Sequence, residues 1–259
     1  MGKRDDGRKT RLKGQDGKTN DKEKREYDLE NHDFIGVGEP NNAYLRKEDQ
    51  DDLEQKALRL IYGGKEDICG DKTLEDYLAL PEGTRVELID GVFYDMASPT
   101  YIHAAIGDGI MYALKSFVKA NKGSCRPFSA PLDVQLDCDD KTMVQPDVLI
   151  VCDPQKLIYP RIVGAPDLIV EVVSPSNFKM DVVKKRFKYE KAGVREYWMV
   201  FPEEKRIRVC HFEKGEEKEY TFADKVPVGI WDGRCEIDFA EIYEWMKPLY
   251  EAMEEAKEN

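Results

Sequence analysis

The chain has few histidines, no closely paired cysteines and no long apolar run. Its 259 residues include 3 His and 6 Cys, and no two cysteines stand in a CxxC pair, so we do not expect a Cys/His zinc site. It has no apolar run near the roughly 18 residues that a membrane span needs and no apolar signal-type segment at the N-terminus. We therefore expect a cytoplasmic protein, not bound to membranes, with free thiols at Cys69, Cys125, Cys138, Cys152, Cys210 and Cys235.

Most of the chain also lacks a net basic charge. The formal net charge is -12; residues 1–26 hold 10 basic and 6 acidic residues, whereas residues 27–259 hold 30 and 46. The first segment thus carries +4 and the remainder -16. Non-specific nucleic-acid binding usually relies on an extended basic surface, which the body of this chain does not provide. A local positive groove remains compatible with this balance.

The N-terminal composition differs from that of the rest of the chain. Residues 1–26 contain one aliphatic residue, Leu12, among freely alternating charges. Such a segment cannot bury enough apolar surface to offset the entropy lost on ordering. We therefore predict a disordered charged tail over residues 1–43, a helical linker extension over 44–71 and one compact domain over 72–259.

Apolar periodicity and turn residues predict the elements of this domain. We expect a short helix capped by Thr73, a hairpin turned at Asp90-Gly91 and a long helix over residues 101–120. Strands are predicted at 131–136, 147–152, 168–173, 195–201, 206–212 and 219–222, and further helices at 181–192 and 239–256. The order from residue 101 to 201 is αβββαβ, which indicates an α/β or α+β domain with helices on a central sheet.

Three acids occupy strand positions where a carboxylate is costly. Glu171 lies within Leu168–Val173, whose two alternating sets of side chains are both apolar, so the strand should be covered on both faces. Glu87 and Asp147 belong to other strand-like segments. A buried carboxylate needs a cationic partner, and Mg2+ or Mn2+ prefers oxygen ligands. The alternative is that each acid pairs with an Arg or Lys, or lies at a frayed strand end.

The helix predicted at 181–192 carries four lysines. At about 100° per residue, Lys185 shares an arc with Val182, Tyr189 and Ala192 and should face protein. The other three lysines, Lys184, Lys188 and Lys191, fall on an arc expected to be solvated. A lysine aimed at the sheet could neutralise carboxylates or align a water molecule, although a snorkelling side chain fits the same pattern.

Several segments resemble a known family. Pro146-Asp147 followed by Glu171-Val172-Val173 resembles the PD-(D/E)xK nucleases, whose core is also αβββαβ. More closely, five segments spread over about residues 72–243 resemble the Uma-two family of restriction-endonuclease-like proteins. They are Glu87–Gly91, Ala130–Val134, Gln145–Val148, Gly164–Ser176 and Gly193–Trp198.

The resemblance implies a restriction-endonuclease-like fold with a mixed central sheet and a site for Mg2+ or Mn2+. Its metal ligands would be Asp147 and Glu171, with Glu87 as a further acid. The usual lysine position holds Val173, and Lys185 on the following helix matches the place to which this family transfers it. His103 and Gln145 would lie on the substrate side. The partner would be nucleic acid, with DNA as the first choice, and a homodimer would suit cleavage of both strands.

The implied activity is endonucleolytic hydrolysis of phosphodiester bonds. The main alternative is a catalytically inactive nuclease-like scaffold that binds a partner or nucleic acid. The acidic body favours this scaffold, whereas the presence of three acids together with Lys185 argues against it. A phosphohydrolase acting on small nucleotides is a third possibility, because fold resemblance alone does not settle function.

Overall fold

The structure, a computed structural model, describes residues 70–136, 140–174 and 180–258. The predicted tail over 1–43 and all but the last two residues of the predicted linker extension lie outside the described residues.

A six-stranded mixed sheet forms the centre of the domain. Its strand order is β12-β11-β10-β9-β6-β3. β9 and β10 run parallel and every other neighbouring pair runs antiparallel. The bounds are β3 Arg126–Ser129, β6 Val148–Val151, β9 Leu168–Val172, β10 Glu196–Phe201, β11 Arg206–His211 and β12 Glu216–Thr221.

A second sheet of short strands has the order β2-β1-β5-β4-β8-β7. Its strands are β1 Val86–Ile89, β2 Val92–Asp95, β4 Val134–Gln135, β5 Met143–Val144, β7 Leu157–Ile158 and β8 Arg161–Val163. β1 and β2 form the predicted hairpin, and its turn residues Asp90 and Gly91 both have positive φ, as this tight turn requires. A separate pair consists of β13 Lys225–Pro227 and β14 Glu236–Asp238.

The helices are α2 Leu74–Leu78, α3 Tyr101–Ala120, α4 Arg186–Ala192 and α5 Phe239–Glu258, and a π-helical turn, η3 Met180–Lys185, leads into α4. The described residues also include the short 3-10 turns η2 Pro154–Lys156, η4 Phe212–Lys214 and η5 Gly229–Trp231. Thr73 and Asp76 form the predicted capping box of α2. Gly193, with a φ of 90°, ends α4, and the end of this helix at residue 192 agrees with the predicted bound.

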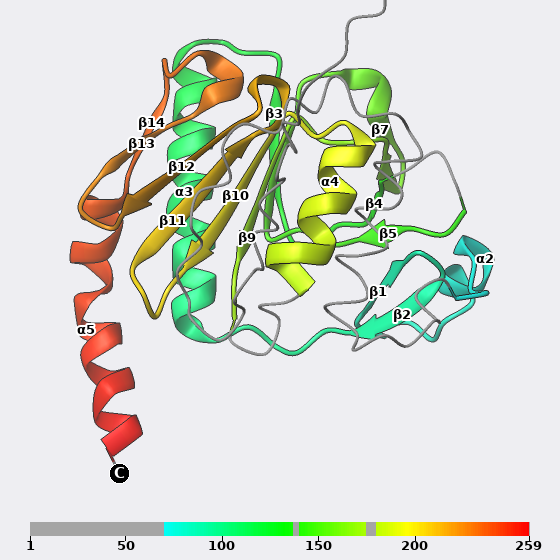
Figure 1. Cartoon of the computed structure of the whole chain (residues 1–259), viewed down its shortest axis with the longest axis horizontal. Coiled ribbons are helices and arrows are strands. Elements are labelled where there is room, and N and C mark those ends of the chain that lie inside the picture. Colours follow the sequence, from blue (N-terminus) through cyan, green and yellow to red (C-terminus); the bar gives the residue numbers. More distant parts are fainter. Residues whose placement is uncertain (1–69, 137–139, 175–179, 259) are drawn as a thin grey trace, which may run out of the picture. The chain divides into compact units, whose positions relative to one another are not determined.

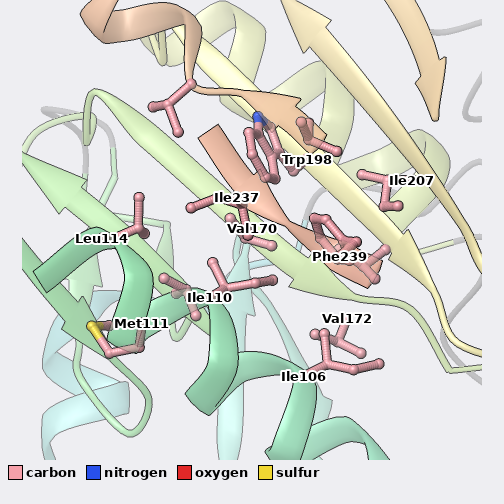
Figure 2. Close-up of a cluster of buried hydrophobic side chains, with 14 of the residues drawn as sticks. Ile106, Ile110, Met111, Leu114, Val170, Val172, Trp198, Ile207, Ile237 and Phe239 are labelled. Carbon is pink, nitrogen blue, oxygen red and sulfur yellow. The ribbon is translucent and has the colours of Figure 1, made fainter. Parts of the chain in front are cut away.

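Two apolar cores lie on opposite faces of the central sheet, and Figure 1 shows α3 and α4 on opposite sides of it. In the first core, Ile106 and Ile110 of α3 face Val170 and Val172 of β9 (Figure 2). The second core lies between the central sheet, α4 and the second sheet, and it receives Ile169. β9 is therefore covered on both faces, as its sequence predicted.

The predicted αβββαβ core is confirmed, with one correction. In the structure it consists of α3, β3, β6, β9, α4 and β10. The segment 131–136 was expected to supply the first of these strands, but it contributes β4 to the second sheet instead. The first core strand is β3, whose sequence RPFS contains Pro127. β3 lies at the edge of its sheet, where a missing backbone donor is tolerated.

The expectation of free thiols is wrong for two of the cysteines. Cys125 and Cys152 form a disulfide. They flank the paired residues Arg126 and Val151 of β3 and β6, so the antiparallel register brings them opposite each other. Cys210 and Cys235 are free and buried, while Cys69 and Cys138 lie outside the described residues. The argument from reduced thiols to a cytoplasmic location therefore fails for this pair.

Within the described ranges, no helix combines the length and the apolar character needed to cross a membrane.

Candidate active site

β6 and β9 bring Asp147 and Glu171 together. Val148 pairs with Val170 in the antiparallel register, so Asp147, one residue earlier, stands beside Glu171. The Oδ2 atom of Asp147 accepts a hydrogen bond of 2.8 Å from the backbone N–H of Val172. Alternation along the strands places both acids on the sheet face that α4 covers, because Leu149 and Ile169 belong to the core on that face. The two predicted ligands thus share one side of the sheet.

Lys185 enters this acidic site from the end of η3. Its Nζ atom lies 2.9 Å from Oε2 of Glu87, 3.0 Å from Oε1 of Glu171 and 3.5 Å from Oδ1 of Asp181. The lysine is only 5% exposed. The prediction that Lys185 faces protein is confirmed, and its burial excludes the snorkelling alternative.

Glu87 reaches the site from β1 in the second sheet. It is buried, and its Oε1 atom accepts a hydrogen bond of 2.8 Å from the backbone N–H of Gln145. The side-chain amide of Gln145 donates to Tyr77 Oη at 3.1 Å and to Asp133 Oδ1 at 2.8 Å. Gln145 therefore fixes Glu87 through its backbone and is itself held by its side chain. A contact between Gln145 and substrate stays a prediction.

His103 lies in the first turn of α3 and extends the cluster. Its Nε2 atom is 2.9 Å from Oδ1 of Asp147, and its backbone N–H donates to the capping Thr100 Oγ1 at 3.2 Å. Asp147 and His103 are each about a fifth exposed, unlike the buried Glu171. The site thus opens to solvent on the side of Asp147, and a role for His103 toward substrate stays a prediction.

Two residues of the site were not among the predicted site residues. Asp181 is 4% exposed and lies one turn before Lys185 on the same side of the helical segment. Tyr189 is fully buried and donates a hydrogen bond of 2.7 Å from its hydroxyl to Glu171 Oε1. Spacing of four residues on either side of Lys185 was the signal that could have found both.

The predicted solvated arc of the lysine helix is wrong for two residues. Lys184 and Lys188 are buried, at 3% and 8% exposure. The Nζ atom of Lys184 donates to Tyr94 Oη and that of Lys188 to Asp90 Oδ1, both at 2.6 Å. Both partners belong to the β1–β2 hairpin, which covers this face of the helix. Lys191 is exposed as predicted.

Burial and mutual repulsion perturb the acids. Burial raises the pKa of Glu171 well above its usual value; Lys185 opposes this, and Asp147, Asp181 and Glu87 add to it. Burial raises the pKa of Asp181 from 3.8 to about 6, again against the effect of Lys185. Burial by itself lowers the pKa of Lys185, but the neighbouring carboxylates outweigh it and the net shift is upward. The site therefore favours the uptake of positive charge.

The donor chemistry fits a hard divalent cation. Glu87, Asp147 and Glu171 offer carboxylate oxygens, which Mg2+ and Mn2+ prefer. However, in the part of the chain that the structure describes, no three His, Cys, Asp or Glu side chains are already arranged around one cation position. The contacts of Lys185 with Glu87 and Glu171 explain this, because the ammonium lies where these carboxylates converge.

The αβββαβ fold and the acid-lysine cluster define a restriction-endonuclease-like protein. The chain belongs to the Uma2 (Uma-two) family, whose model is described as "Putative restriction endonuclease" and matches residues 74–229. No curated protein matches the chain.

A solved structure supports the same fold. It is the crystal structure of a "putative nuclease belonging to DUF820" from Anabaena variabilis ATCC 29413, with a TM-score of 0.57 and 23% sequence identity. The match covers 67% of this chain and 98% of that chain. At this identity the likeness establishes the fold alone.

Proposed function

We propose that this protein is a divalent-metal-dependent endonuclease that hydrolyses phosphodiester bonds, with DNA as its substrate. The observation that carries the proposal is a cluster of four carboxyl groups: those of Glu87, Glu171 and Asp181 surround the ammonium of Lys185, and that of Asp147 lies beside Glu171. Such an excess of buried acid is costly unless the site serves to take up a cation. Membership of the nuclease family supports the choice of reaction.

In this proposal each side chain has a defined role. Asp147 and Glu171 hold Mg2+ or Mn2+, and Glu87 is the further acid on the opposite wall. The cation would polarise the scissile phosphate and lower the pKa of a water molecule. Lys185 aligns that water or stabilises the charge that develops on the phosphate. His103 and Gln145 stand on the substrate side, and a homodimer would present two such sites to a duplex.

The test is cleavage by the purified full chain. Supercoiled plasmid, single-stranded DNA and RNA are incubated with Mg2+, with Mn2+ or with EDTA. We expect metal-dependent nicking or cutting of DNA that Glu171→Gln and Asp147→Asn each abolish. Glu254→Gln is the matched control, since Glu254 is an exposed acid on α5 and lies outside the cluster. Cleavage that persists in both site variants would end the catalytic assignment.

Calorimetry with Mn2+ separates this proposal from an inactive scaffold. The observation that favours the scaffold is that Lys185 already neutralises part of the acid cluster internally. An active site predicts saturable Mn2+ binding that Glu171→Gln removes. A scaffold predicts no saturable uptake in either protein.

A further inference from the structure

The Lys185 ammonium occupies the place where a cation would be expected. It contacts Oε2 of Glu87 at 2.9 Å and Oε1 of Glu171 at 3.0 Å, so one point charge bridges carboxylates from two different sheets. The proposed function assigns Glu171 to the metal and places Glu87 on the opposite wall of the same site. The other oxygen of Glu87 accepts the backbone N–H of Gln145, so Glu87 is held in this position.

Two cations cannot share this place at low cost. Lys185, Glu87 and Glu171 are each at most 5% exposed, so water screens charges there poorly. A divalent ion binds carboxylate oxygens at about 2.0–2.6 Å. An ion at that distance from Glu171 would lie within a few ångströms of an ammonium bonded to the same group, and the two would repel each other strongly.

Asp181 offers the ammonium another partner. It stands 3.5 Å from Lys185 Nζ, one turn earlier on the same helical segment, and is buried. Because both residues belong to η3, this pairing does not depend on how the two sheets approach each other. The flexible four-carbon stem of a lysine allows its ammonium to shift among neighbouring carboxylates.

We propose that Lys185 is the internal counterion of the metal-free site, that a divalent cation displaces it from Glu87 and Glu171, and that Asp181 retains the displaced ammonium. The proposal rests on the metal site of the proposed function. It adds that Lys185, which is assigned a role in the chemistry, also competes with the divalent cation for the carboxylates. Uptake of the cation then moves the Lys185 ammonium away from Glu87 and Glu171.

The test is Mn2+ affinity, measured by calorimetry at one fixed pH near 8 on the full chain. Lys185→Met removes the competing charge and keeps the length of the side chain. We expect it to bind Mn2+ about tenfold more tightly or better, because a repulsive charge within a few ångströms is gone. Lys185→Arg retains the charge and should remain within about twofold of the wild type. Lys191→Met, at an exposed position of α4, is the matched control and should behave likewise.

Lys185→Gln serves as a second neutral variant if Lys185→Met does not fold, and a melting curve in EDTA checks each protein. Unchanged or weaker Mn2+ binding in a folded neutral variant, beside saturable binding in the wild type, would overturn this inference and leave the proposed function standing. No saturable binding in the wild type or in any Lys185 variant would instead refute the metal site of the proposed function.

A double-mutant cycle tests the part played by Asp181. Asp181→Asn should weaken Mn2+ binding in the wild-type background, because the displaced ammonium then has no carboxylate on its own helix. In the Lys185→Met background the same change should alter the affinity by less than about twofold. An equal loss in both backgrounds would mean that Asp181 attracts the ion directly, which contradicts the retaining role.

Discussion

Replacing Asp181 with Asn should stabilise the metal-free protein at neutral pH. The carboxyl group is 4% exposed and its pKa rises from 3.8 to about 6, chiefly through burial. Asn has nearly the same shape and carries no charge. Lys185 keeps its two shorter contacts, to Glu87 and Glu171, so the change does not leave a buried ammonium without partners.

The sign follows from proton binding. When the pKa of an acid is higher in the folded state, the folded chain binds more protons between the two values, and stability falls as pH rises. The protonated Asp181 therefore makes its full contribution to the free energy of unfolding below pH 3.8. This contribution is lost as pH rises through about 6. A shift of about two pKa units corresponds to about 3 kcal/mol. Glu171 acts in the same direction and is present in both proteins.

The assay is urea unfolding in EDTA at pH values from about 4 to 8, for the wild type and Asp181→Asn. The free energy of unfolding of the variant minus that of the wild type should increase by about 2 kcal/mol across this range, because part of the full change already lies below pH 4. Asp108→Asn, at an exposed position of α3, is the control and should show no comparable trend. The raised pKa of Lys185 makes stability change with pH only above about pH 10.5, which lies outside this range.

A difference that stays constant with pH, or that shifts in favour of the wild type as pH rises, would refute this reasoning. Either result would mean that the pKa of Asp181 is not raised in the folded protein, because Lys185 offsets the cost of burial in the first case and outweighs it in the second.

Two further predictions concern the fold. Ile110→Ala removes a fully buried side chain from the core between α3 and the central sheet and should lower the free energy of unfolding by about 2–5 kcal/mol, measured in urea; a loss under about 1 kcal/mol would contradict the packing described. The disulfide spans a sequence separation of 27, so Cys125→Ser/Cys152→Ser should cost about 3 kcal/mol under oxidising conditions. Reductant should bring the wild type close to the stability of this variant, and equal stability without reductant would argue against the bond.

Local patterns predicted those parts of the fold that a single element determines. The apolar spacing over 101–120 predicted the bounds of α3 as observed, and Thr73 and Asp90-Gly91 predicted a cap and a turn. Around Glu171, both alternating sets of side chains are apolar, and this predicted a strand covered on both faces, as observed. These features depend on backbone geometry within a few residues, so the sequence alone determines them.

The chemistry of the site could be predicted in part. Glu87, Asp147 and Glu171 stood out because each is an acid in a strand, and Lys185 because its neighbours on the helical arc are apolar. Asp181 did not stand out, because an acid in the first turn of a helix is ordinary and usually solvated. Only tertiary packing buries it, at 4% exposure and beside Lys185.

The sequence by itself determined the order of elements and the double coverage of β9, and it singled out the carboxylates that we propose as cation ligands. Tertiary structure decided which charges are buried and which groups meet. Lys184 of η3 and Lys188 of α4 lie on one helical arc, which would be solvated in an isolated helix. In the fold, the β1–β2 hairpin of the second sheet covers this arc. Likewise, the β3–β6 register brings Cys125 beside Cys152. Periodicity describes one element and its faces, whereas burial and pairing depend on what another part of the chain places against them.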